Sequence, residues 1–282
     1  MSVEAEAVIT LGRIGVASAI GAVGLGLAYL AAAGAPVQYL AVNAGTLVIG
    51  LLGVTAWKKW AQPAVTVAGL AAFAIGLALL ATALFGHSLD GATRWVRIGP
   101  LALQPGLILT PLLAVLVSRD RSLWATTGVI IAAAALALQP DRATAGALAA
   151  GMAALALTKQ DRRVLTALFA TGAAFTVALV RPDTLPAQPF VERVLFTAFE
   201  TNLAAGIAVW IGVKWLLIPA IAGRVLDPEN TPTYAVFGAV WLGIIAASAL
   251  GNYPTPLVGY GASSILGYVL SLAALSGRPQ NA

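Results

Sequence analysis

The chain has 282 residues, of which 60% are apolar and 10% are charged, and its mean hydropathy is +0.90. Soluble globular domains carry about 45–50% apolar and about 25% charged residues, so a soluble, disordered or fibrous protein is excluded. The net charge of +5 then reflects membrane topology rather than a phosphate-binding surface, and we expect no nucleic-acid partner. Cysteine is absent, which excludes disulfides, Cys-ligated metals and a thiol nucleophile.

Apolar runs follow one another along the whole chain and predict transmembrane helices. A span needs about 20 residues, so a chain of this length holds at most roughly ten of them. The N-terminus carries two glutamates before its first arginine, which is not typical of a cleaved secretory signal. Proline interrupts the fourth run, whose first part is compatible with a position along the membrane interface. The runs cover 14–33, 37–56, 63–86, 101–118, 123–139, 143–158, 164–180, 194–222, 234–250 and 258–276.

The basic residues between these runs support ten spans with both termini in the cytoplasm. With the N-terminus inside, ten Lys and Arg residues fall in inside segments and five in outside segments, alternating loop by loop, as the positive-inside rule expects. The inside residues are Arg13, Lys58, Lys59, Arg119, Arg121, Lys159, Arg162, Arg163, Arg224 and Arg278, and the outside ones are Arg94, Arg97, Arg142, Arg181 and Arg193. We predict an all-α polytopic membrane protein of about ten helices, with a single integral membrane domain over residues 1–282.

The predicted outer loops, near 87–105, 139–144, 181–193 and 251–261, carry the residues with chemical potential. Arg94 and Arg97 are three residues apart, so a helical turn would put them on one face. Two guanidinium groups there can hold a phosphate or pyrophosphate bidentately, or they can contact lipid headgroups on an interfacial helix. Asp141 can cap the sixth span, bind a cation or orient Arg94.

Two acids surround the start of the eighth predicted span. Glu192 stands at its outer end, and Glu200 lies eight residues further on, which is about 12 Å deeper in one continuous helix. An ionisable group inside a span is by default a functional hypothesis. Glu200 can instead form a structural hydrogen bond with Asn202. Further along, residues 259–264 can start the last helix with amides aimed at an anion, or they can be a helix start without a ligand.

Three of these segments together resemble the SEDS family, the FtsW and RodA type of cell-cycle and cell-shape membrane proteins. GATRWVRIGPLALQP (91–105) resembles the family's GA-x-RW-x-x-x-G…QPSE stretch, and LALQPDRATA (136–145) resembles its QPDLGTA. PTPLVGYGASSILGYVL (254–270) resembles its P-x-P-F-x-S-Y-GGSS ending. The matches come in the family's order, on the expected membrane side, and the resemblance runs from about residue 13 to 276.

The resemblance implies a ten-span glycosyltransferase of the bacterial inner membrane, a SEDS-like bundle that polymerises lipid II at its outer face. It implies a lipid-linked sugar precursor as substrate, membrane lipids as neighbours, and a transpeptidase or another cell-division membrane protein as partner. It assigns Glu192 as the catalytic base. The substrate-binding residues would be Arg94, Arg97, Gln104, Asp141, Glu200, Tyr260, Ser263 and Ser264. We expect no metal site of protein ligands, although a divalent cation near Asp141 is compatible with a pyrophosphate substrate.

The chain also departs from the family's pattern. The Glu and Lys that follow QP in the family are Leu107 and Thr110 here, and the loop before the eighth span is short. Counting back from Gly206, Glu192 falls where the family has an Asp. Two alternatives therefore stay open: a non-catalytic relative that binds lipid-linked precursor or a membrane partner, and a transporter with a polar cavity around Glu200 and Asn202.

Overall fold

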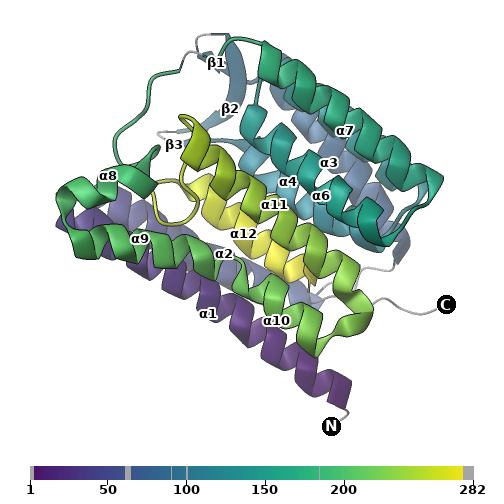
Figure 1. Cartoon of the computed structure of the whole chain (residues 1–282), viewed down its shortest axis with the longest axis horizontal. Helices are drawn as coiled ribbons and strands as arrows, with labels where there is room; N and C mark the ends of the chain where they lie inside the picture. Colours follow the sequence, from purple (N-terminus) through teal and green to yellow (C-terminus); the bar gives the residue numbers. More distant parts are fainter. Residues whose placement is uncertain (1–2, 61–64, 90, 100, 184, 276–282) are drawn as a thin grey trace.

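Long helices make up most of the computed structural model, which describes residues 3–60, 65–89, 91–99, 101–183 and 185–275 (Figure 1). Arg278 and the side chains of Lys58 and Lys59, which entered the charge argument, lie outside this description. The first seven helices are α1 Val3–Ala32, α2 Val37–Trp60, α3 Val65–Phe85, α4 Pro105–Arg119, α5 Leu123–Leu138, α6 Arg142–Thr158 and α7 Arg162–Val180. The remaining elements are α8 Val194–Thr201, α9 Leu203–Trp215, α10 Ile218–Leu226, the 3₁₀ helix η1 Pro228–Asn230, α11 Thr231–Leu250 and α12 Ala262–Leu275.

The helices are apolar enough for a protein that crosses the membrane several times. Among the described residues, six helical segments have the length and composition of a membrane span, and four further apolar helices are shorter. The prediction of a helical multi-pass membrane protein is therefore confirmed. The count of ten spans and the cytoplasmic position of both termini stay predictions.

The predicted eighth span, 194–222, is not one helix. The chain breaks at Asn202, whose backbone is extended and whose side-chain oxygen accepts the Ala205 N–H at 2.8 Å. The short helix α8 then packs back along α9, and the Trp210 indole N–H donates to the Leu195 carbonyl at 2.9 Å. An asparagine that caps a new helix ends the old one, because its side chain replaces the backbone acceptor. The continuous apolar segment begins only at Leu203.

The segment 87–105 is also different from the expectation. It forms three short antiparallel strands in the order β1-β2-β3, namely β1 His87–Leu89, β2 Ala92–Ile98 and β3 Leu101–Leu103. Glycines with positive φ, Gly91 and Gly99, lie between the strands, where other residues would be strained. The expected helical turn is therefore wrong. In a strand, residues three apart point to opposite faces, which separates Arg94 from Arg97.

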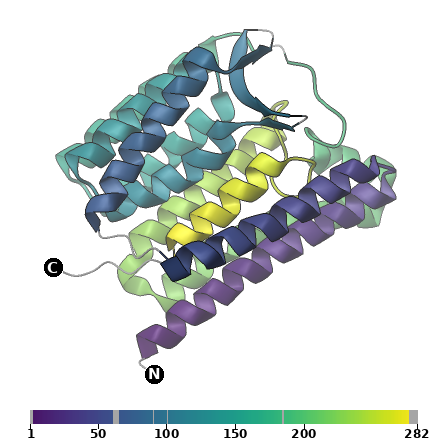
Figure 2. The same cartoon turned by 180° about the vertical axis from the view of Figure 1, so that it is seen from behind.

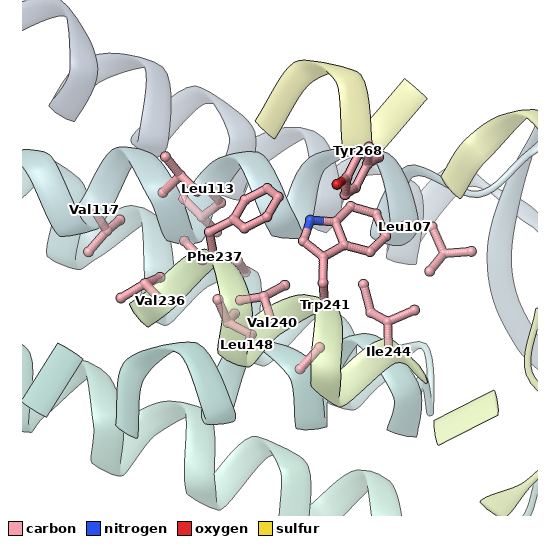
Figure 3. Close-up of a cluster of buried hydrophobic side chains, with 14 of the residues drawn as sticks. Leu107, Leu113, Val117, Leu148, Val236, Phe237, Val240, Trp241, Ile244 and Tyr268 are labelled. Atoms are coloured by element: carbon pink, nitrogen blue, oxygen red, sulfur yellow. The ribbon is translucent and has the colours of Figure 1, made fainter. Parts of the chain in front are cut away.

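The helices form two groups that meet at α12. Helix α1 packs with α2, α9 and α10 on one side, while α3 to α7 pack with one another and α11 packs with α4 and α6 on the other (Figures 1 and 2). Helix α12 contacts both α2 and α4. The core beside it contains Trp241, Tyr268 and Phe237, whose rings pack together among aliphatic side chains (Figure 3). The Trp241 indole N–H donates to Ser271 Oγ at 3.2 Å, so its polar atom is satisfied inside the bundle.

The two ends of the bundle differ. One end carries the three strands together with the segments before α8 and α12, and we call it the sheet end. The opposite end, where α1 begins and α12 ends, also carries the α4–α5 and α6–α7 connections, and we call it the far end (Figure 1). Most of the residues that the sequence singles out lie at the sheet end.

Candidate functional site

Arg94 is buried in the middle of the sheet end. Only 3% of its side chain is exposed, because alternate residues of β2 face the bundle. Its Nε donates to the Gln139 carbonyl at 3.2 Å and its terminal nitrogen to the Pro140 carbonyl at 2.7 Å. A cation at the end of α5 satisfies carbonyls that have no partner within the helix. Arg94 therefore binds the protein's own backbone with part of its guanidinium.

The same guanidinium forms a buried ion pair with Asp183, with an N–O distance of 2.7 Å. The Tyr253 hydroxyl donates to the same Asp183 oxygen at 2.7 Å. Burial alone would lower the pKa of Arg94, but the carboxylates of Asp141 and Asp183 raise it above its ordinary value. Burial and the bond to Asp183 raise the pKa of Tyr253. Arg94, Asp183 and Tyr253 thus connect β2, the segment before α8 and the segment before α12 in one charged network.

A second network joins the starts of α4, α6 and α12. Asp141 is fully buried and caps α6 by accepting the Thr144 N–H at 3.1 Å, which confirms the predicted cap. Its other oxygen accepts the Gln104 side-chain amide at 3.0 Å, and the Gln104 backbone N–H donates to Ser263 Oγ at 2.8 Å. Three predicted site residues are thus brought together by hydrogen bonds to one another.

The segment before α12 is attached to α2 through Asn43. This fully buried asparagine donates to the Gly259 carbonyl at 2.9 Å and accepts the Gly261 N–H at 3.0 Å. Tyr260 stacks on Tyr39, with ring centroids 3.8 Å apart and planes 7° from parallel. Ser264 Oγ donates to the Gly261 carbonyl at 3.3 Å, which closes the turn on itself. The segment that carries Tyr260 and Ser264 is therefore rigidly held.

Glu192 lies where the segment before α8 meets the segment before α12. It pairs with Pro254 in an isolated antiparallel bridge, and the Thr255 N–H donates to the Val191 carbonyl at 2.9 Å. Phe190, two residues before Glu192, and Arg193, directly after it, have positive φ angles of 66° and 59°. Such conformations cost on the order of 1–3 kcal/mol each and cluster at functional sites.

The Glu192 carboxylate is half-buried and accepts the Gln188 backbone N–H. Burial raises its pKa above the ordinary value, and the Asp183 carboxylate acts in the same direction. The Gln188 N–H and the Arg94 guanidinium oppose this rise in pKa. A partly accessible carboxylate with a raised pKa is a better proton acceptor than an ordinary carboxylate.

Two predicted substrate-binding residues lie apart from these networks. Arg97 is exposed on the last part of β2, on the opposite face of the strand from Arg94. Glu200 is exposed near the break at Asn202, rather than two turns deep inside a span, because α8 ends there and the chain reverses. Glu200 therefore does not face a central polar cavity with Asn202, whose side chain caps α9.

The described residues contain no group of three or more His, Cys, Asp or Glu side chains that could hold a metal ion. The Asp141 carboxylate is close enough to Arg94 to raise its pKa, and it is fully buried between Gln104 and the start of α6. A divalent cation near Asp141 would have to draw its other ligands from a bound substrate.

Sequence reasoning missed Asn43, Asp183 and Tyr253. Asn43 is a lone amide in the middle of an apolar run, which is a signal for a buried hydrogen-bonding role. Asp183 is acidic and lies in a short loop beside a proline, but no sequence pattern indicates that it pairs with Arg94, which is 89 residues away. Asn43 and Asp183 hold the segments that carry the predicted site.

Neither a protein-family model nor a curated protein sequence matches the chain. Several solved structures are similar in fold, including the following three. The rod shape determining protein RodA of Thermus thermophilus has a TM-score of 0.62 and 22% identity, over 92% of this chain and 92% of that one. A mutant of the same protein gives 0.61 and 20%, over 92% and 93%.

The third structure is a chain from work on the coordination of polymerization and crosslinking by a peptidoglycan synthase complex. Its TM-score is 0.62 at 22% identity, over 92% of this chain and 94% of that one. RodA is a member of the SEDS family, so the fold predicted from the three sequence segments is confirmed. In its fold, the chain is a SEDS-like membrane protein that shares the architecture of RodA over nearly its whole length.

Proposed function

We propose that the chain is a peptidoglycan glycosyltransferase of the SEDS type, which elongates glycan from a lipid II-like polyprenyl-pyrophosphate sugar. It acts in the bacterial inner membrane with the sheet end on the outer face. The proposal rests mainly on Glu192. Its carboxyl group is partly accessible, its pKa is raised, and it lies on a strained turn where two loops meet. Its position is the one at which the family resemblance expects the base.

In the proposed reaction, Glu192 accepts the proton of the acceptor sugar hydroxyl. The hydroxyl oxygen forms a bond to the anomeric carbon of the donor while the bond from that carbon to the pyrophosphate oxygen breaks. Polyprenyl pyrophosphate leaves, and the proton stays on Glu192 until it is released to water. A positioned general base contributes typically 10²–10⁴-fold to the rate.

The arginines divide the remaining work in this proposal. Arg94 positions the loops, since its guanidinium is bound to two backbone carbonyls and to Asp183. Arg97, exposed on the same strand, can contact the pyrophosphate. Its planar guanidinium suits bidentate contact with phosphate oxygens.

A specific observation favours a second function, binding without catalysis. Leu107 and Thr110, which replace the charged pair of the family, are buried at 2% and 0% exposure. The Leu107 carbonyl lies against Gly267, where an added Cβ would approach it to 2.1 Å, so α4 and α12 are in close contact there. A chain with this contact can hold a lipid-linked precursor, or a transpeptidase-type partner, without polymerising.

Incubation of the purified protein with lipid II in liposomes separates the two functions. The enzyme reading predicts glycan polymer and its loss in Glu192→Gln, with precursor binding retained. The binding-only reading predicts bound precursor, no polymer from the wild type, and the same behaviour in the variant. The matched control is Glu200→Gln, because Glu200 is exposed and lies outside the networks described above.

A further inference from the structure

The far end contains a hollow that the proposed reaction does not use. Its volume is about 610 Å³, and it is lined by Asp120, Arg121, Ser122, Asp161, Arg162 and Arg163. These residues belong to the α4–α5 and α6–α7 connections. The positive-inside argument puts this end at the cytoplasmic surface of the membrane.

The two carboxylates of the hollow form hydrogen bonds or an ion pair within the protein. Asp161 caps α7 by accepting the Val164 N–H at 2.9 Å, and its other oxygen pairs with Arg121 at 3.0 Å. Asp120 accepts the Ser122 N–H at 2.8 Å, and its second oxygen faces Gly69 of α3. Among the described residues, neither acid forms an ion pair with Arg162 or Arg163.

The two remaining arginines leave donors available. Arg163 uses one terminal nitrogen on the Arg121 carbonyl at 3.0 Å, and its side chain is exposed. The Arg162 side chain is exposed, and among the described residues it forms no hydrogen bond or ion pair, since only the Arg162 backbone carbonyl accepts one, from the Thr166 hydroxyl. Guanidinium groups with free N–H donors at the rim of a hollow favour a phosphate group over a neutral ligand.

Large apolar side chains begin directly beside the arginines. Leu123 and Trp124 on α5 are 68% and 53% exposed, and Leu165 and Phe169 on α7 are 48% and 80% exposed. Helices α5 and α7 pack against each other, and the Trp124 ring also packs edge-on against Phe73 of α3, so exposed apolar side chains flank the hollow on both helices. A tryptophan next to arginines at a helix end is typical of the headgroup level of a membrane.

We propose that this hollow binds the headgroup phosphate of an anionic phospholipid, with the acyl chains along the exposed faces of α5 and α7. Charge complementarity selects the anionic headgroup, and the adjoining apolar surface selects a lipid over a free phosphate. The proposal does not depend on catalysis at the sheet end.

Native mass spectrometry of the purified protein, titrated with phosphatidylglycerol or phosphatidylcholine, tests the proposal. We expect at least about tenfold tighter binding of phosphatidylglycerol, since each basic residue at a membrane surface is worth about fivefold. The double variant R162Q/R163Q should lose roughly thirtyfold on the same basis. Arg224→Gln is the matched control, because Arg224 is an exposed arginine outside the hollow, on α10.

Equal affinity for the two lipids, or equal losses in R162Q/R163Q and Arg224→Gln, would overturn the proposal. Glycerol phosphate that binds as tightly as the lipid would overturn it as well, because the apolar surface would then be irrelevant. Fluorescence quenching by brominated lipids locates the site without relying on the double variant. The quenching due to Trp124 is the difference between the wild type and Trp124→Phe. This difference should be larger with brominated phosphatidylglycerol than with brominated phosphatidylcholine, and an equal difference with the two lipids would contradict the assignment.

Discussion

Arg94 and Asp183 form an ion pair of 2.7 Å between side chains that are 3% and 8% exposed. The pair connects β2 with the segment before α8, and Arg94 also holds the carbonyls of Gln139 and Pro140. A buried charge that loses its partner is costly. We therefore infer that the pair stabilises the sheet end, and that the side chains around it contact the substrate.

Arg94→Ala should destabilise the protein by about 3–5 kcal/mol, because it leaves the buried Asp183 carboxylate without its cation and removes a donor from each of two backbone carbonyls. Arg97→Ala, on the same strand but exposed, should leave stability unchanged. Thermal unfolding of both variants in the same detergent measures the difference. Equal unfolding midpoints for the two variants would show that the pair has no structural role.

The activity should depend on the protonation state of Glu192. The base is active when deprotonated, so kcat/KM should fall as the pH drops through the pKa of Glu192, which burial and Asp183 raise above the ordinary 4.5. Asp183→Asn removes a negative charge that raises this pKa, so the acid limb should move to lower pH. Because this variant also loses the ion pair with Arg94, it is assayed well below its unfolding temperature. A pH–rate profile of both proteins measures the shift. An acid limb in the same place, or at higher pH, would argue against Glu192 as the base.

The contact between α4 and α12 should tolerate no added methyl group. A Cβ at Gly267 would approach the Leu107 carbonyl oxygen to 2.1 Å, and a backbone atom cannot move aside as a side chain can. Gly267→Ala should therefore destabilise the protein by roughly 1–3 kcal/mol. Gly172→Ala on α7 is the control, because its Cβ would meet nothing within 4 Å. The helix there should be unchanged or slightly stabilised. Unfolding midpoints that rank the two variants in the opposite order would refute the close contact.

Cysteine labelling tests the orientation in the membrane, since the wild type contains no cysteine. A cysteine at Ser88 on β1 should react with an impermeant maleimide added to intact cells. A cysteine at Gln160, in the α6–α7 connection, should react only after the membrane is opened. Both positions are exposed, so accessibility within the protein does not decide the result. The reverse pattern would invert the proposed topology and remove Glu192 from the outer face.

The helices could be predicted from the sequence because apolar runs report burial or lipid contact directly. The run 37–56 is part of α2, and the run 143–158 coincides almost entirely with α6. The cap at Asp141 could be predicted too, since an aspartate before a helix start accepts a nearby N–H. These features depend on neighbours along the chain, and local sequence carries that information.

The missed features depend on contacts between distant segments or on short elements. The strands around Arg94 have three to seven residues, and such lengths give little periodic signal. The break at Asn202 did have a local signal, a capping residue at the end of three polar residues, but apolar residues on both sides favoured a single run over 194–222. The pairing of Arg94 with Asp183 joins residues 89 positions apart, and no sequence pattern specifies it.

The proposal that the chain is a glycosyltransferase with Glu192 as its base is tested most directly by polymer yield. Equal amounts of wild type, Glu192→Gln and Glu192→Asp are incubated with lipid II, and glycan chains are resolved on a gel. We predict polymer from the wild type, none from Glu192→Gln, and a reduced amount from Glu192→Asp, whose carboxylate is one methylene shorter. Polymer from Glu192→Gln at the wild-type level would contradict the assignment of the base, and no polymer from the wild type would contradict the proposed activity itself.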